Sequence, residues 1–101
     1  MSSPQEPWKK DMLRRFYHQP GENNISRPIG YKVEGQQKKG TIVWQETDCN
    51  GKPSLIFTVR DEHSKYILVD LTFAEDRSDG VVLDRDIYEK NYILQQIAAR
   101  R

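Results

Sequence analysis

The chain has 101 residues, of which 36% are apolar and 31% are charged, and its net charge is +1. This balance favours one well-hydrated domain, residues 1–101, with a single modest core. No stretch of the sequence approaches the ~18 consecutive apolar residues that a membrane span needs. The single cysteine, Cys49, excludes an internal disulfide and favours a reducing compartment. Residues 1–6 have neither a basic start nor an apolar run, so we expect a flexible segment without a secretion signal. We therefore expect a cytoplasmic protein without membrane contact.

Residues 7–18 predict a basic amphipathic helix. Proline is tolerated at its first position, and Trp8, Met12 and Phe16 recur at a spacing of four on its apolar half. The other half is basic, and Pro20-Gly21 ends the helix.

Charge is unevenly distributed along the chain. Residues 1–40 hold eight basic and four acidic residues, whereas residues 41–101 hold eight basic and eleven acidic residues. The basic half either meets an anionic partner or folds back onto the acidic half of the chain.

A sheet is predicted over residues 30–83. After a short strand around Tyr31 and a polar turn at 35–40, the apolar runs 41–44 and 55–59 flank Asn50-Gly51, a strong hairpin signal. A two-residue turn there pairs positions whose numbers sum to 101, which places Trp44 opposite Phe57.

The next strand is expected over residues 66–73, with paired numbers that sum to 126. Val59 then faces Ile67, Phe57 faces Val69, and Asp61 faces Lys65 across a short loop. We expect His63 to take the positive φ that such a loop requires.

A polar turn at 74–80 leads to a brief strand, 81–83, and Asp84 is predicted to cap a helix over 84–100. One face of that helix carries Ile87, Ile93, Leu94, Ile97 and Ala98. We expect this face to cover the apolar side of the sheet.

The two registers sort the strand side chains into two faces. The core face would carry Ile42, Trp44, Leu55, Phe57, Val59, Ile67, Val69 and Leu71. The reverse face is amphipathic, with Val43, Ile56 and Leu68 framed by polar groups. Either the N-terminal helix covers it in part, or a partner does.

The sequence matches catalytic and metal-binding motifs only weakly. The acidic turn 75–80 departs from the calcium-loop pattern because Arg77 and Ser78 stand at ligand positions. Neighbours of His63 on a hairpin tip do not converge as a catalytic triad must, and Cys49 has no adjacent base. We therefore predict no catalytic residue, no metal site and no cofactor, and we lean against an enzyme.

The predicted fold is α+β, with a single antiparallel sheet, a meander of about five strands, between an N-terminal and a C-terminal helix. The alternative is a small SH3-like or Sm-like barrel with flanking helices. Its distinguishing mark would be residues 81–83 lying beside the first strand.

The leading functional hypothesis is a non-enzymatic protein–protein interaction module whose partner is another protein or a second copy. Its predicted partner-binding residues are Lys10, Arg14, Arg15, Val43, Ile56, Thr58, Arg60, Tyr66 and Leu68. One alternative is binding of RNA or DNA through Lys9, Lys10, Arg14, Arg15, Lys38 and Lys39. Another is a small-ligand pocket between the sheet and the N-terminal helix.

Overall fold

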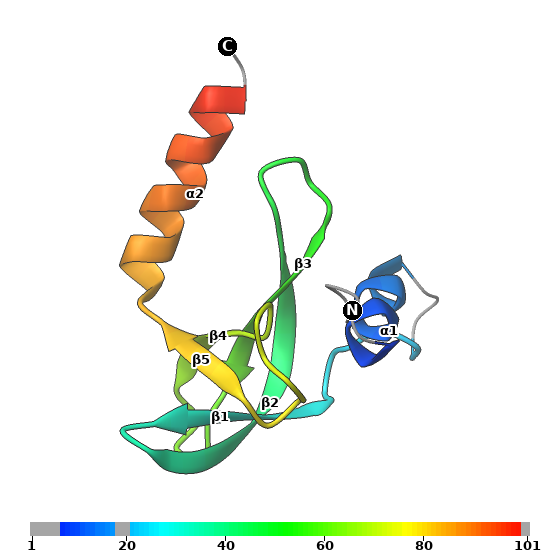
Figure 1. Cartoon of the computed structure of the whole chain (residues 1–101), viewed down its shortest axis with the longest axis vertical. Coiled ribbons are helices and arrows are strands. Elements are labelled where there is room, and N and C mark those ends of the chain that lie inside the picture. Colours follow the sequence, from blue (N-terminus) through cyan, green and yellow to red (C-terminus); the bar gives the residue numbers. More distant parts are fainter. Residues whose placement is uncertain (1–6, 18–20, 100–101) are drawn as a thin grey trace.

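The computed structural model describes residues 7–17 and 21–99 (Figure 1). The elements are α1 (Pro7–Arg14), the 3-10 turn η1 (Arg15–Tyr17), β1 (Pro28–Val33), β2 (Gln36–Thr47), β3 (Pro53–Arg60), β4 (Tyr66–Asp70), β5 (Gly80–Leu83) and α2 (Arg85–Ala99). The predictions for residues 1–6, for the end of the first helix at 18–20 and for Arg100 lie outside the described residues.

The five strands form a closed barrel in the order β1-β2-β3-β4-β5. Consecutive strands pair antiparallel, so the first and fifth run in the same direction and closure is by a parallel pair, Tyr31 with Gly80 and Lys32 with Val81. The α+β prediction is confirmed, and the sheet takes the barrel form of the alternative. A side chain at Gly80 would clash, because its Cβ would lie 2.9 Å from the Gly30 carbonyl oxygen.

The β2–β3 register is confirmed at one end and wrong at the other. Ile42 pairs with Val59 as predicted, but after an irregularity between Ile42 and Trp44 the partner of Phe57 is Gln45. Trp44 therefore lies outside the core, 60% exposed. The expected two-residue turn at Asn50-Gly51 is instead a longer loop, because a second irregularity lets Thr47 pair with Pro53.

The β3–β4 register is confirmed: Phe57 pairs with Val69 and Val59 with Ile67. The Asp61 carboxylate accepts hydrogen bonds from the backbone N–H groups of His63 and Lys65, both at 2.8 Å. This arrangement puts the positive φ on Ser64, at 63°, so the expectation for His63 is wrong.

Two further boundaries differ from the prediction. β4 ends at Asp70, whose carboxylate accepts the Thr72 N–H at 2.8 Å and turns the chain, so that Phe73 is 91% exposed. Between β1 and β2 the turn is confined to Glu34 and Gly35, both with positive φ, and the predicted polar turn at 35–40 is mostly strand.

The core lies inside the barrel and under α1. Most of the predicted core residues are buried there, and Met12 from α1 is fully buried among them. Asp84 caps α2 as predicted, since its carboxylate accepts the N–H groups of Asp86 and Ile87. The expectation that α2 covers the core face is wrong: Figure 1 shows α2 leading away from the barrel.

The reverse face of the sheet is covered in part by the first turn of α2. Leu68 is 1% exposed, and the Arg85 guanidinium donates to the Thr58 hydroxyl oxygen at 3.3 Å. The Thr58 hydroxyl in turn donates to the Glu46 carboxylate at 2.8 Å. Val43 and Ile56 remain half-buried.

Candidate functional site

α2 carries an apolar stripe that the described fold leaves exposed. The helix is 15 residues long, which corresponds to ~22 Å. The stripe consists of Ile87, Ile93, Leu94 and Ile97, which are 61%, 57%, 57% and 49% exposed. Residues three or four apart are neighbours on a helix, so Ile93 and Leu94 both lie beside Ile97, and Ile87 lies two turns before Leu94 on the same side. We call this set the α2 stripe.

A different side of α2 attaches the helix to the barrel. The Tyr88 hydroxyl donates to the Thr47 carbonyl oxygen at 3.4 Å, and the Tyr88 ring stacks on Tyr92 with centroids 6.1 Å apart. Burial, and then the nearby Glu46 carboxylate, raise the pKa of Tyr88 to about 12. The phenol therefore keeps its proton and remains a donor to Thr47 at neutral pH.

A groove lies between α2 and the β2–β3 hairpin. Its volume is about 480 Å³, and its lining includes Ile56, Val82, Ile87, Tyr88 and Tyr92. We call it the hairpin groove. Because Ile87 belongs to both features, the groove and the α2 stripe are continuous around the helix.

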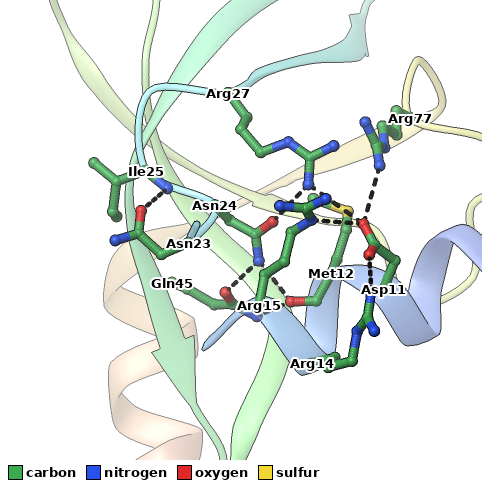
Figure 2. Close-up of polar contacts among 10 residues, drawn as sticks. All are labelled: Asp11, Met12, Arg14, Arg15, Asn23, Asn24, Ile25, Arg27, Gln45 and Arg77. Carbon is green, nitrogen blue, oxygen red and sulfur yellow. Dashed lines mark hydrogen bonds and ion pairs between the residues drawn. The ribbon is translucent and has the colours of Figure 1, made fainter. Parts of the chain in front are cut away.

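Away from α2, four arginines converge on one carboxylate, that of Asp11 in α1 (Figure 2). The Asp11 carboxylate receives Arg15 at 2.8 Å and Arg14 at 2.9 Å, with Arg27 at 3.6 Å and Arg77 at 3.8 Å. Hydrogen bonds from Arg15 and then Arg14 lower the pKa of Asp11 to about 2. We call these four side chains the arginine cluster.

Beneath the cluster, buried amides fasten α1 to the sheet. The Asn24 side-chain amide donates to the Met12 carbonyl oxygen at 2.5 Å and to the Gln45 side-chain oxygen at 2.7 Å. Asn24 also accepts from Arg27 at 3.0 Å (Figure 2). Met12, Asn24 and Gln45 thus fill part of the space between α1 and the sheet, and the small-ligand alternative stays a prediction.

A second groove lies next to the arginine cluster and shares Arg77 with it. It has a volume of about 630 Å³, and its lining includes Trp8, Ile29, Lys39, Asp76 and Arg77. We call it the Trp8 groove. The Trp8 indole N–H donates to the Glu75 carbonyl oxygen at 3.2 Å, which fixes the ring beside the loop that carries Arg77.

The predicted partner-binding residues do not form one surface. Arg14 and Arg15 join the arginine cluster, and Ile56 lines the hairpin groove. Thr58 and Leu68 are buried, whereas Lys10, Arg60 and Tyr66 are exposed and Val43 is half-buried.

The residues of the nucleic-acid alternative are also divided. Lys9 is 6% exposed and donates to the Thr72 carbonyl oxygen at 3.0 Å, so its ammonium group faces the protein. Lys38 lies 3.7 Å from Glu62. Lys39 is exposed at the Trp8 groove.

Sequence reasoning recognised the α2 stripe as apolar but assigned it to the core. It did not place Arg27 and Arg77 beside Asp11, because these residues lie in separate loops and meet α1 only through the fold. The only available signal was the positive charge of these residues, and charge in a sequence does not reveal which distant loops come together in the fold.

Among the described residues, no group of three or more His, Cys, Asp and Glu side chains is arranged to hold a metal ion. The His63 side chain is 74% exposed and lies 3.5 Å from Glu62. Within the same residues, no helix is both long enough and apolar enough to cross a bilayer.

Comparison with known proteins finds no matching family model, no matching curated protein and no matching solved structure.

Proposed function

We propose that this protein is a small non-catalytic interaction module that binds another protein through the α2 stripe and the adjoining hairpin groove. The observation that carries the proposal is that four large aliphatic side chains of one helix are about half-exposed. Contiguous exposed apolar patches mark interaction sites on soluble proteins.

The free energy available at this surface supports the proposal. Burying a whole isoleucine or leucine side chain stabilises a complex by about 1.5–3 kcal/mol, so covering the exposed half of each gives about 1 kcal/mol. The four side chains together supply about 4 kcal/mol before the entropy of association is subtracted. The hairpin groove adds further contact area from Ile56 and Tyr92.

The chemistry of the partner follows from the stripe. Lys90 lies three residues after Ile87 and four before Leu94, so an exposed ammonium group stands inside the apolar surface. A complementary partner presents an apolar face, such as one side of an amphipathic helix, with a carboxylate opposite Lys90.

The test combines two measurements on the wild type and the double variant Ile93→Glu/Leu94→Glu, with Lys65→Gln, at an exposed position in the loop between β3 and β4, as the control. Light scattering over a concentration series reports self-association, and affinity capture from a native lysate reports other partners. The proposal requires association that the control retains and the double variant loses. A monomer that captures the same proteins with and without the stripe would refute it.

A further inference from the structure

The arginine cluster holds more positive charge than its carboxylate neutralises. Four guanidinium groups surround Asp11, which leaves three positive charges in excess within the cluster. Arg14 and Arg15 already occupy the two carboxylate oxygens at 2.9 and 2.8 Å. Arg27 and Arg77, at 3.6 and 3.8 Å, lie beyond ordinary hydrogen-bond distance of that carboxylate.

The fold, rather than Asp11, holds the two outer arginines in place. Arg27 is bonded to the buried Asn24 at 3.0 Å. The loop that carries Arg77 is fixed to β1, because the Gly30 N–H donates to the Arg77 carbonyl oxygen at 2.6 Å. The Gln37 side chain also donates to the Ser78 carbonyl oxygen at 2.7 Å.

Bringing these cations together has an electrostatic cost. Burial lowers the pKa of Arg77, and the nearby Arg27 lowers it further. A bound anion would offset both effects, and phosphate suits the planar fork of guanidinium donors. The side chains are accessible to such a ligand, with exposed fractions from 25% for Arg27 to 67% for Arg14.

The Trp8 groove adds an aromatic surface to this cationic site. Arg77 belongs to both features, and Trp8 and the exposed Lys39 line the same groove. Its acidic lining residue Asp76 is engaged by Ser78, whose backbone N–H donates to the carboxylate at 2.7 Å. An aromatic ring beside a row of cations is the arrangement that binds unpaired bases and their phosphates.

We propose that the arginine cluster and the Trp8 groove bind single-stranded nucleic acid, with phosphates at Arg27, Arg77 and Lys39 and a base against Trp8. This site is separate from the α2 stripe, so the two proposals stand or fall independently. An unpaired strand is favoured over a duplex because the groove offers a ring for stacking, which a paired base cannot reach.

Fluorescence anisotropy with a labelled 12-nucleotide single strand tests the site. Neutralising about three phosphates predicts a slope of log affinity against log salt of roughly −2, which is about a twentyfold loss between 50 and 200 mM salt. Arg77→Gln and Lys39→Gln each weaken binding and make the slope shallower by about 0.7. The exposed Lys52, in the β2–β3 loop, is the matched control: Lys52→Gln leaves affinity and slope unchanged.

A second readout separates base stacking from attraction of any anion. In a Trp44→Phe background Trp8 is the remaining tryptophan, and the strand is expected to quench its fluorescence. Absence of binding at low salt would overturn the proposal. So would binding that Lys52→Gln weakens as much as Arg77→Gln does. Equal affinity for a polyglutamate peptide, or binding of the strand without quenching of Trp8, would also overturn it.

Discussion

Gln45 lies opposite Phe57 in the β2–β3 pair, at the place that strict alternation along β2 would give to Trp44. The irregularity before Trp44 turns the indole outward and brings a polar amide to the core side, where Gln45 is 4% exposed. The Asn24 amide satisfies it at 2.7 Å. One backbone irregularity thus replaces an apolar contact with a buried hydrogen-bond network that fastens α1.

Asn24→Ala is expected to destabilise the fold by about 2–4 kcal/mol, because it leaves the Gln45 side-chain oxygen without this donor in the interior and leaves the Met12 carbonyl with the longer hydrogen bond from the Gln45 amide, at 3.4 Å. Urea unfolding measures the change. The matched substitution at an exposed site, Asn50→Ala, is expected to change stability by less than about 0.5 kcal/mol. Equal losses in the two variants would contradict this network.

Closure of the barrel depends on close approach at Gly80. In Gly80→Ala the new Cβ would lie 2.9 Å from the Gly30 carbonyl oxygen and would press on Val69, with an expected cost of about 1–3 kcal/mol. Gly51→Ala is the comparison, because its Cβ meets nothing within 4 Å and only its φ of 78° is unfavourable, at about 1–2 kcal/mol. Hydrogen exchange distinguishes them, since Gly80→Ala selectively loses protection at β1 and β5.

Much of the fold follows from local patterns. The cap at Asp84 and the pairing of Phe57 with Val69 were predictable, because a carboxylate before a helix and alternation along paired strands act at short range. The displacement of Trp44 was not, since it depends on a distant asparagine and on α1.

The candidate surfaces were predictable only in part. An amphipathic pattern in α2 establishes that one face is apolar, but it does not establish what covers that face. The basic helix indicated Arg14 and Arg15, whereas Arg27 and Arg77 reach Asp11 only once the barrel has positioned their loops.

Acid is expected to weaken the attachment of α1. The pKa of Asp11 falls from 3.8 to about 2 on folding, so its stabilising contribution is complete above about pH 4 and is lost as the pH falls towards 2. Asp11→Asn removes this contribution and leaves the arginines to repel one another. Unfolding curves of the wild type and variant should differ at pH 6 and converge near pH 2. A difference that stays constant over that range would contradict this role for Asp11.

Leucines on α2 and in the barrel should respond differently to truncation. Leu94 is 57% exposed and Leu68 is 1% exposed. Leu94→Ala is expected to change the free energy of unfolding by less than about 0.5 kcal/mol, whereas Leu68→Ala costs about 2–5 kcal/mol. A large loss from Leu94→Ala would show that the α2 stripe packs within its own chain.

The most direct test of the interaction surface is site-specific photo-cross-linking. A photoreactive amino acid is placed at Leu94 in the α2 stripe or at the exposed Lys65 in the loop between β3 and β4, and each protein is irradiated in native lysate. The proposed function predicts a discrete cross-linked product, with a partner protein or a second copy, from position 94 and none from position 65. Identical products from both positions, or no product from position 94, would contradict it.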